Sequence, residues 1–366
     1  MITNLIIGLF LLGTIVYFSI LLFVIRGLLG IEQKPPRKDE FVTVVVSFRN
    51  EVLNISNLLQ SLKELTYPID LFEVIFVNDG STDGGEKLVE AEMDKQLHWD
   101  LIVISDKPKY LQGKKYGLTK AIEKSKGDVI LTTDADCEVP PNWIQTMLGH
   151  LSPEVGMVLG HSPIHEDGTF FHRLLAFDVM AGSAVTAAGA FYNKPPHSNG
   201  RNLMYRKQAF FDVNGYSESG YLDSGDDFFL SQAVRKKTGW KFDFSPSPEA
   251  YVFTKAYSLG EKFLNQQLRK NSKAVYHTIP FLLAAFGILL HIIGLPFFVF
   301  SGVMGISSIL ALFVIKISLE FWAVVMASEK LHLLHMRKYY PVMAVLYPMF
   351  ILIFSLAGSF KLYQWK

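Results

Sequence analysis

Long apolar runs flank a middle region in which short apolar and polar segments alternate. The first run, Leu5–Ile25, contains no charged residue, and about 20 apolar residues let a helix cross the ~30 Å hydrocarbon core of a bilayer. Three more apolar runs follow His277: Thr278–Phe300, Ser301–Met326 and Tyr340–Phe360. The pattern predicts one N-terminal transmembrane helix and about three C-terminal ones.

The charges beside these runs indicate how the helices cross the membrane. Four basic residues follow the first run: Arg26, Lys34, Arg37 and Lys38. A cleaved signal peptide would instead carry its basic residues before a shorter apolar stretch. We therefore expect an uncleaved anchor that leaves the middle of the chain in the cytoplasm, the side that basic residues favour. A second basic cluster, also expected inside, separates the last two runs: Lys330, Arg337 and Lys338.

The run Ser301–Met326 is the weakest of the predicted spans because it contains two charged residues. Lys316 and Glu320 are one helical turn apart, so their side chains can pair. A charge inside a membrane segment is a candidate for function. The alternative, which we favour, is a structural ion pair buried between helices.

In the middle region, runs of β-branched and aromatic residues alternate with helical stretches. Four runs predict strands: Phe41–Ser47, Phe72–Asn78, Leu101–Ser105 and Asp128–Thr133. Helices are expected between them, for example over Glu51–Leu65 and Lys114–Lys124. This alternation predicts an α/β fold with a mostly parallel sheet between two layers of helices. Such sheets bind ligands outside the carboxyl ends of their strands, so chemistry is expected there.

Composition and charge exclude several classes of protein. The chain has 35 basic and 34 acidic side chains, and this balance argues against a dedicated nucleic-acid binder, which needs a basic excess. The single cysteine, Cys137, excludes an intrachain disulfide framework and any multi-cysteine zinc site. Together with the predicted topology, it favours a reducing, cytosolic middle domain.

Two carboxylates follow the predicted strand Asp128–Thr133. Asp134 and Asp136 form a D-A-D sequence at the edge where ligands are expected. Hard cations such as Mg²⁺ or Mn²⁺ prefer oxygen ligands and are held by one or two carboxylates together with substrate phosphates. The pair is therefore suited to holding a metal against a diphosphate. Since D-x-D is common in sequences, a solvated loop is the alternative.

Two other predicted strand ends carry residues suited to a nucleotide. Asp79, in VNDGSTD, can accept a hydrogen bond from a nucleobase imide or a ribose hydroxyl, and Gly80 allows close backbone approach. Lys114 opens a predicted helix, and its ammonium can meet a diphosphate or a base. Taken singly, N-D-G is as typical of a structural turn, and such a lysine is as typical of the solvated surface.

Taken together, the motifs resemble those of family 2 glycosyltransferases with the GT-A nucleotide-sugar fold. The donor-side segments occur in the expected order and spacing: SFRNE, VNDGSTD, GKKYGLTKAI and TTDADCEVP. SNGRNLMYRKQAF, VNGY and SGDDFFL are similar to the family's acceptor-side block, G-x-N-x-x-Y-R followed later by G-E-D or T-E-D. The resemblance covers roughly Phe41 to Asn271, and it implies a GT-A nucleotide-diphospho-sugar transferase domain with flanking transmembrane helices.

The resemblance also implies roles for the donor-side residues. Asp79 contacts the nucleotide base, and Lys114 is assigned to the same nucleotide. Asp134 and Asp136 become the pair that holds Mg²⁺ or Mn²⁺ against the diphosphate, with Asp136 the more direct ligand.

On the acceptor side, the resemblance makes Asp227 the general base that takes the proton from the acceptor hydroxyl. Asp226 stands where the motif has glutamate, a shorter side chain with the same charge, so either carboxylate can serve. The chemistry suits this arrangement, because in-line attack on an anomeric carbon needs a base on one face and a stabilised leaving group on the other. Capping of the helix that follows is the alternative role for both residues.

A further segment resembles the family's Q-x-x-R-W motif, with Lys270 in place of tryptophan. In membrane-bound members this motif lies on an interfacial helix, where the arginine faces the diphosphate and the tryptophan stacks on the acceptor sugar. Gln266 and Arg269 are then expected at the diphosphate. The implied domains are a membrane anchor (1–33), a cytoplasmic GT-A domain (34–257), an amphipathic interfacial helix (258–277) and a C-terminal transmembrane region (278–366).

Three remaining features receive no catalytic role. His161 and His165 lie near the carboxylates in sequence, but no third ligand is spaced to complete a metal site, so we expect ordinary polar positions. The aromatic-rich tract Phe170–Tyr192 is expected either to border the acceptor site near the membrane or to form a buried packing helix.

These expectations combine into an inverting hexosyltransferase of cell-envelope glycan synthesis. It would move a sugar from a nucleotide-diphosphate sugar to a lipid-linked, lipid-like or saccharide acceptor, in contact with membrane lipids, at the cytoplasmic face of a bacterial inner membrane. One alternative is a processive polysaccharide synthase, which the missing tryptophan and the few C-terminal spans disfavour. Another is a non-catalytic membrane subunit of a glycan-assembly complex, which the full set of acidic motif residues disfavours. The motifs do not identify the nucleotide, the sugar or the acceptor.

Overall fold

A computed structural model describes residues 2–108, 110–222, 224–255, 260, 264, 267–268 and 279–359. The chain forms two compact units. The helical unit takes its described residues from 2–29, 166–181 and 256–366, and the sheet unit takes them from 30–165 and 182–255. The helical unit therefore holds most of the predicted anchor and the C-terminal region, and the sheet unit holds most of the predicted catalytic domain, without 166–181.

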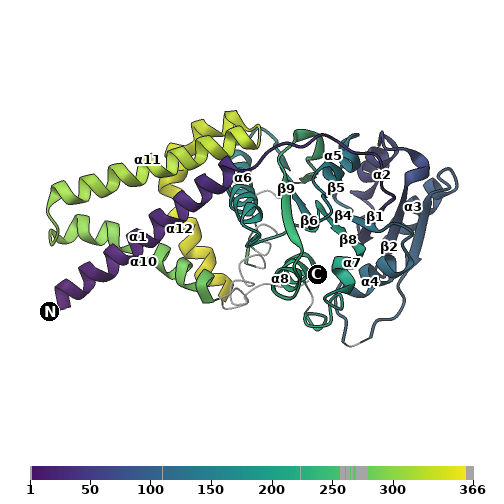
Figure 1. Cartoon of the computed structure of the whole chain (residues 1–366), viewed down its shortest axis with the longest axis horizontal. Coiled ribbons are helices and arrows are strands. Elements are labelled where there is room, and N and C mark those ends of the chain that lie inside the picture. The colour runs from purple at the N-terminus through teal and green to yellow at the C-terminus, as the bar shows by residue number, and fades with distance from the viewer. Residues whose placement is uncertain are drawn as a thin grey trace. The chain divides into compact units, whose positions relative to one another are not determined.

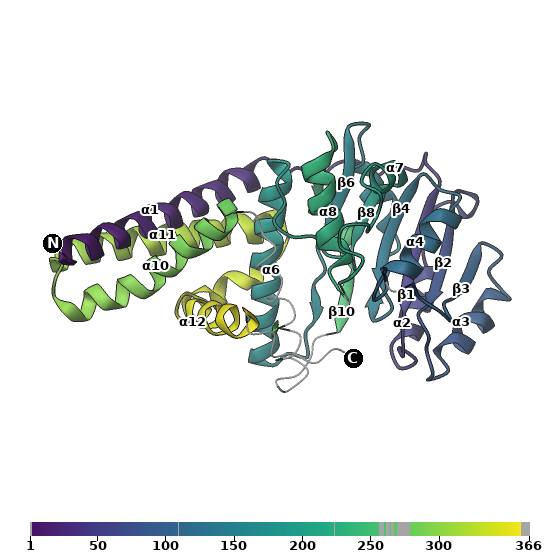
Figure 2. The same cartoon turned by 90° about the horizontal axis from the view of Figure 1, so that it is seen from below.

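The helical unit contains four long apolar helices: α1 (Ile2–Leu29), α10 (Ile279–Ser301), α11 (Ile306–Lys330) and α12 (Tyr340–Ser359). A short 3₁₀ segment, η4 (Leu334–Tyr339), joins the last two. Helix α1 lies along both α10 and α11 (Figures 1 and 2). All four helices fall on the ranges predicted for membrane spans.

Three helices are long and apolar enough to cross a membrane within the described ranges: α1, α6 (Phe170–Phe191) and α11. The N-terminal helix and the weakest predicted span, Ser301–Met326, are thus supported. Helix α6 is an addition, because the aromatic-rich tract Phe170–Tyr192 is predicted only to border the acceptor site or to form a packing helix. It contributes residues 170–181 to the helical unit and 182–191 to the sheet unit.

A seven-stranded sheet forms the centre of the sheet unit, in the order β3-β2-β1-β4-β8-β6-β9. Its strands are β1 (Val42–Phe48), β2 (Phe72–Asn78), β3 (Trp99–Val103), β4 (Val129–Asp134), β6 (Val155–Gly160), β8 (Leu203–Arg206) and β9 (Lys241–Ser245). Strands β1 to β4 run parallel, as do β6 and β9, whereas β8 is antiparallel to both β4 and β6. The prediction of a mostly parallel α/β sheet is confirmed. The prediction did not include the antiparallel strand β8.

Helices cover both faces of this sheet: α2 (Ile55–Lys63), α3 (Gly85–Met93), α4 (Lys115–Lys124) and α5 (Trp143–Gly149). Alternate residues of β1 and β2, such as Val44 and Val74, share a core with α2, α3 and α5. On the opposite face α4 packs against Val77, and Gly117 permits this because a Cβ there would lie 2.4 Å from the valine Cγ1 (Figure 1). Burial of both faces explains why the strands carry apolar residues at consecutive positions.

The remaining elements lie around the second half of the sheet. They are α7 (Lys207–Phe211), α8 (Asp226–Lys237), η1 (Ile69–Leu71) and η2 (Pro248–Ala250). A small second sheet has the order β5-β10-β7, with strands β5 (Cys137–Glu138), β7 (Ile164–His165) and β10 (Phe253–Lys255). The predicted interfacial helix over 258–277 lies almost entirely outside the described residues.

Candidate active site

The carboxyl ends of β2, β1 and β4 lie side by side at one edge of the sheet. In this parallel register Ser47 of β1 is level with both Val77 of β2 and Asp134 of β4. Asp79 directly follows β2 and Asp136 follows β4, so the predicted base contact and the predicted metal pair share this edge. Strands β2 and β4 are two strand spacings apart, roughly 10 Å, a distance that a nucleoside diphosphate can bridge.

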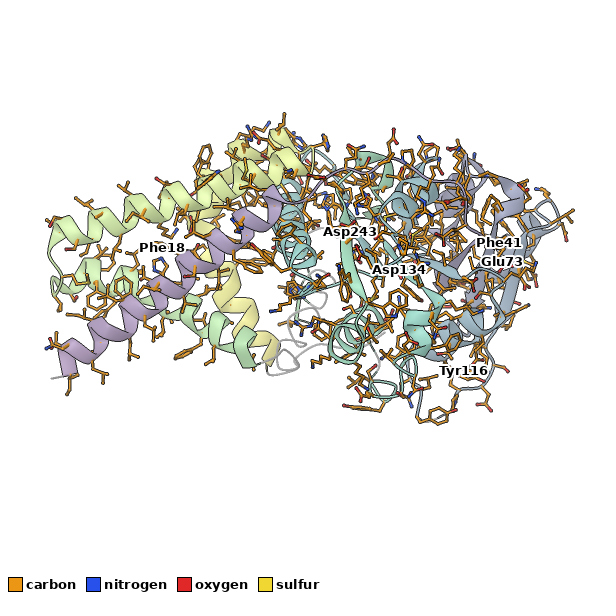
Figure 3. All side chains as sticks on the ribbon, viewed as in Figure 1. Phe18, Phe41, Glu73, Tyr116, Asp134 and Asp243 are labelled. Atoms are coloured by element: carbon orange, nitrogen blue, oxygen red, sulfur yellow. The ribbon has the colours of Figure 1, made fainter. Side chains whose placement is uncertain are left out.

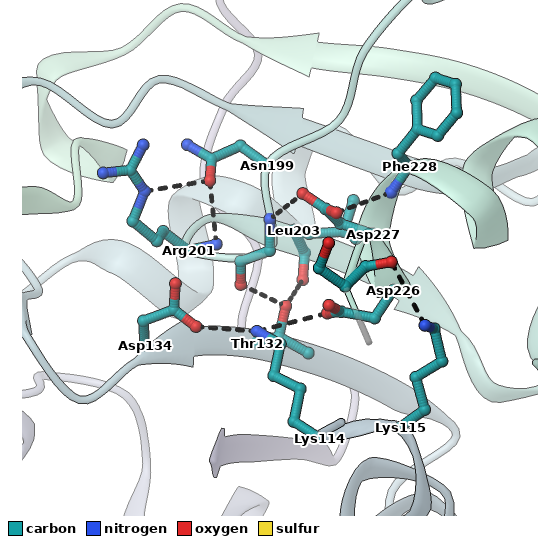
Figure 4. Close-up of polar contacts among 12 residues, drawn as sticks. Lys114, Lys115, Thr132, Asp134, Asn199, Arg201, Leu203, Asp226, Asp227 and Phe228 are labelled. Carbon is teal, nitrogen blue, oxygen red and sulfur yellow. Dashed lines mark hydrogen bonds and ion pairs between the residues drawn. The ribbon is translucent and has the colours of Figure 1, made fainter. Parts of the chain in front are cut away.

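Lys114 connects the end of β4 with the start of α8. Its Nζ lies 2.9 Å from Asp134 Oδ1 and 3.3 Å from Asp226 Oδ2 (Figure 4). Burial lowers the pKa of Lys114, but the charges of Asp134, Asp226 and Asp227 raise it, and the net result lies well above the usual lysine value. The ammonium therefore stays charged between the donor-side and acceptor-side carboxylates.

The acidic pair opens α8 after a tight turn. Gly225, the residue before the helix, has a φ of +83°, a left-handed conformation that glycine adopts without strain. Asp227 Oδ2 accepts a 2.9 Å hydrogen bond from Gly200 N, and its Oδ1 accepts one of 2.8 Å from Phe228 N. Asp227 therefore accepts a hydrogen bond from the first turn of α8 and also contacts the loop that borders the site.

A short loop, Asn199–Arg201, lies between β4 and α8. Thr132 Oγ1 of β4 donates a 2.8 Å hydrogen bond to Gly200 O, while Gly200 N holds Asp227. Asn199 Oδ1 accepts hydrogen bonds from both the backbone N and the Nε of Arg201. We had assigned no role to Asn199 or Arg201, although both lie in the SNGRNLMYR motif that marked this block.

The D-x-D carboxylates are suited to a cation. Burial raises the pKa of Asp136, and the charge of Asp134 raises it further, while Arg201 lowers it. Cys137 Sγ approaches Asp136 Oδ1 at 3.6 Å. No group of three or more His, Cys, Asp or Glu side chains in the described ranges can hold a metal by itself. A cation here would relieve the crowding of negative charge and would need oxygen ligands from a substrate.

A buried carboxylate at the opposite edge of the sheet shows a different arrangement. Glu73, near the amino end of β2, accepts hydrogen bonds from Thr43 Oγ1 at 2.8 Å and from Lys126 N at 2.7 Å. Lys126 Nζ is also within 3.5 Å of it. Glu73 and Asp134 are labelled in Figure 3. Donors surround Glu73, so it has a structural role, whereas Asp134 and Asp136 repel each other.

Asp79 sits in a turn shaped by its neighbours. Its carboxylate is nearly buried and pairs with Lys107 Nζ at 2.5 Å, while its backbone N donates to Phe48 O. Asn78 Oδ1 accepts a hydrogen bond from Ser81 N, and Gly80 has a φ of +75°. Lys107 is a cation at the end of β2 that the motifs did not identify.

A small pocket joins the acceptor-side carboxylates to the sheet edge. Asp226 and Asp227 line it together with Lys114, Gly200 and other described residues, among them Ser47, Thr133 and Tyr205. Asp79 and Asp136 share the sheet edge but are not among its lining residues. Gln266 and Arg269, predicted at the diphosphate, lie outside the described residues, as does Lys270.

The two histidines near the site have separate partners. His161 Nδ1 lies 2.7 Å from Ser183 Oγ, and His165 Nε2 lies 3.4 Å from Glu138 Oε2. Burial, with a smaller effect of Arg201, lowers the pKa of His161 to about 3, so its imidazole is neutral at physiological pH.

Comparison with known proteins places these residues in a wider group. Residues 43–213 match the model of the family described as glycosyl transferase family 2. The chain is 35% identical over 187 residues to a probable glycosyltransferase, YdaM, of Bacillus subtilis, an alignment covering 50% of this chain and 44% of that protein. It is 26% identical over 196 residues to the beta-monoglucosyldiacylglycerol synthase of Nostoc sp., covering 51% of this chain and 40% of that one. The chain thus spans less than half the length of these two relatives.

A solved structure is similar over nearly the whole chain. This is the mannosyltransferase PcManGT from Pyrobaculum calidifontis in complex with GDP-Man and Mn²⁺, with a TM-score of 0.58 at 18% sequence identity. The match covers 94% of this chain and 98% of that chain. At this identity the likeness is one of fold, and the GT-A fold expected from the motifs is confirmed.

Proposed function

We propose that this chain is a family 2 glycosyltransferase, since residues 43–213 match the model of that family, and that it moves one sugar from a nucleotide-diphosphate donor to a lipid-linked or lipid-like acceptor. We place the reaction at the cytoplasmic face of a bacterial inner membrane, with inversion of the anomeric centre. One observation carries this proposal: the Lys114 ammonium lies within 3.3 Å of both Asp134 and Asp226. The groups assigned to donor and acceptor therefore belong to one cluster, as transfer to a single anomeric carbon requires.

On the donor side, each residue has a place that its position supports. Asp79 contacts the base or ribose at the end of β2, and Asp134 and Asp136 hold the diphosphate end. These two carboxylates would hold Mg²⁺ or Mn²⁺, which supplies charge stabilisation to the leaving diphosphate. Lys114 orients Asp134 and adds a positive charge close to the same group.

On the acceptor side, Asp227 acts as the general base. The acceptor oxygen forms a bond to the anomeric carbon, and the bond from that carbon to the diphosphate oxygen breaks with its electron pair. The hydroxyl proton passes to Asp227. Asp227 is preferred to Asp226 because Asp226 pairs with Lys114, whereas no ion pair within 4 Å involves Asp227 in the described part of the chain.

A lipid acceptor is supported by two features. Helices α1, α6 and α11 are long and apolar enough for the enzyme to lie in a membrane. The similar protein from Nostoc sp. is named for a glucosylated diacylglycerol, a lipid product. Gln266 and Arg269 remain proposed contacts to the diphosphate from the membrane side.

The test is a donor screen with the full chain purified in detergent. UDP-, GDP- and dTDP-sugars are offered with Mn²⁺ or Mg²⁺ and a lipid extract, and both nucleotide release and product mass are measured. We expect turnover of at least one donor, a product one sugar heavier than its acceptor, and loss of turnover in Asp227→Asn. The matched control is Asp94→Asn, which neutralises an exposed carboxylate at the end of α3.

Three outcomes would contradict the proposal. No turnover of any donor would favour a non-catalytic subunit. A ladder of products differing by single sugars would favour a processive synthase. Full turnover in Asp227→Asn would reject the assignment of the base while leaving the donor chemistry intact.

A further inference from the structure

The guanidinium of Arg201 is held through its Nε by a neighbouring side chain. Its Nε donates to Asn199 Oδ1 at 3.1 Å, and the backbone N of Arg201 donates to the same oxygen at 3.2 Å (Figure 4). Among the residues that the structure describes, the guanidinium makes no other hydrogen bond and no ion pair within 4 Å. Arginine carries five N–H donors in a planar fork and is always charged, so the four on its terminal nitrogens can serve a ligand.

The loop position brings Arg201 to the end of β4. Gly200, the residue before it, is hydrogen-bonded through its carbonyl to Thr132 Oγ1, two residues before Asp134 on the same strand. Figure 4 draws the side chains of Arg201 and Asp134 in the same group of contacts. The guanidinium therefore belongs to the strand end whose carboxylates are proposed to hold the diphosphate end of a donor.

The loop that carries Arg201 is tied to both sides of the site. Gly200, the residue before it, holds Asp227 through its N–H and is held by Thr132 of β4 through its carbonyl. A cation at position 201 is thus fixed relative to the candidate base by one intervening peptide unit. Lys114 differs because Asp134 and Asp226 already occupy its ammonium.

We infer that Arg201 is a donor-binding residue whose terminal amino groups donate hydrogen bonds to phosphate oxygens of the nucleotide diphosphate, with Asn199 as its positioning residue. A planar guanidinium can meet two such oxygens at once, which an ammonium cannot. This inference rests on the proposed function and adds a residue to it. Arg201 supplies a fixed positive charge to the leaving group from the acceptor-side loop.

The test measures nucleotide binding by the full chain in detergent, without acceptor. Calorimetry is run with UDP and GDP, each in Mn²⁺ and in EDTA, and the matching nucleoside is measured by displacement of the diphosphate. We expect Arg201→Gln to weaken nucleoside-diphosphate binding about 10-fold or more in both media, because it loses hydrogen bonds to a charged group. Nucleoside binding is expected to stay within about 3-fold of wild type, because a nucleoside has no phosphate for the guanidinium to contact.

Two further variants separate charge from geometry. Arg201→Lys keeps the positive charge but lacks the planar guanidinium, so its affinity for the nucleoside diphosphate should lie between those of the wild type and Arg201→Gln. Asn199→Ala keeps the guanidinium but removes its hydrogen-bond acceptor. It should therefore weaken binding of the nucleoside diphosphate but not of the nucleoside, and by less than Arg201→Gln does. Lys241→Gln is the matched control, since it removes an exposed cation at the amino end of β9, away from the strand ends of the site.

Several results would overturn the inference. Unchanged diphosphate binding in Arg201→Gln, or an equal loss for nucleoside and diphosphate, would exclude a phosphate contact. A loss seen in Mn²⁺ but not in EDTA would show that Arg201 acts only through the metal. If the wild-type chain bound no nucleotide at all, the proposed function would fall and this inference with it. If the wild-type chain does bind nucleotide, a loss of binding in Arg201→Gln therefore tests Arg201 alone.

Discussion

Each unit of the molecule contains a lysine paired with carboxylate, partly buried in the case of Lys114 and buried in the case of Lys316, and the two clusters differ in charge balance. In the sheet unit, Lys114 lies between Asp134 and Asp226, and two more carboxylates, Asp136 and Asp227, lie nearby. Arg201 is a further cation that acts on Asp136. The acidic groups outnumber the cations, so the cluster has capacity for a divalent ion.

The cluster in the helical unit is balanced. Lys316 Nζ of α11 lies 2.7 Å from Glu320 Oε1, one turn along the same helix. The hydroxyls of Tyr17 of α1 and Tyr340 of α12 donate to the same carboxylate. His291 of α10 stacks on the Tyr17 ring, with the ring centroids 4.6 Å apart. Here one cation, Lys316, pairs with one carboxylate, Glu320, and the two tyrosine hydroxyls also donate to that carboxylate.

The difference indicates which buried charges bind ligands. A neutral pair whose carboxylate oxygens are both hydrogen-bonded leaves little for a ligand to stabilise, and it fits a role in holding helices together. An excess of buried carboxylates is unfavourable until a cation arrives, which is typical of a binding site. Four sets of substitutions test this contrast.

The largest expected effect is that of Asp227→Asn. Removing a general base typically lowers turnover by about 10²–10⁴-fold. Asp226→Asn should cost about 10-fold, because that carboxylate orients Lys114 and its loss removes one charge-assisted hydrogen bond. Steady-state turnover of both purified variants measures this. A larger loss in Asp226→Asn than in Asp227→Asn would move the base to Asp226.

Lys316→Met should break the balanced pair and leave Glu320 buried without its cation. Breaking a buried ion pair by removing one partner typically costs about 3–5 kcal/mol of stability. Thermal unfolding in detergent should show this loss, whereas turnover per folded molecule should stay near wild type. The double variant Lys316→Met with Glu320→Gln should recover most of the stability, since the amide oxygen can accept from one tyrosine hydroxyl and the amide nitrogen can donate to the other.

A different result would move Lys316 and Glu320 into function. If Lys316→Met lost turnover while keeping its unfolding temperature, and the double variant failed to restore it, the pair would not be merely structural. The contrast between the two clusters would then fail.

Lys114→Met should give the reverse pattern to Lys316→Met. Turnover should fall about 10²-fold, because a preorganised positive charge is lost where negative charge develops in the transition state. The unfolding temperature should change little or rise when Mn²⁺ is present to neutralise the carboxylates. Lys120→Met, which removes an exposed lysine from the same helix, serves as the control. Equal loss of stability in Lys114→Met and Lys316→Met would show that both lysines are structural.

Much of the fold was predictable because the strands of this sheet are buried on both faces. Strands β1 to β4 are rich in β-branched and aromatic residues, and the predicted ranges differ from the observed ones by at most two residues. Strand β8 was not predicted, because Leu203–Arg206 is four residues long and its antiparallel place depends on pairing with β4 and β6. Local sequence carries little information about such distant pairing.

The candidate site was predictable in its residues but not in its contacts. Asp79 and Asp134 could be placed at one edge because they end parallel strands. The contact of Lys114 with Asp226 joins residues 112 positions apart, and only the fold brings them together. Arg201 had a weaker signal, a basic residue beside Gly200 at a position that the family motif leaves open. Lys107 had none, since it lies in an ordinary polar loop.

The smallest effect concerns His161 and His291, a buried histidine from each unit, and it extends the comparison to pH. His161 Nδ1 meets Ser183 Oγ, and His291 Nδ1 meets Thr14 Oγ1 at 2.9 Å, while neither Nε2 has a hydrogen-bond partner in the described residues. Burial, and then Arg201, lowers the pKa of His161 to about 3.

An unfolded histidine titrates near 6.5, so below that pH the unfolded chain binds a proton that folded His161 does not. Stability is therefore complete above pH 6.5 and falls as the pH drops toward 3, by up to about 1.4 kcal/mol per pH unit. His161→Gln should flatten this slope in unfolding measured between pH 7 and 4.5, whereas His165→Gln, which removes an exposed histidine, is the control. If the dependence of stability on pH were the same in His161→Gln as in the wild type, His161 would take up a proton in the folded chain as well. His161 would then add a second positive charge to that of Arg201 near the metal pair.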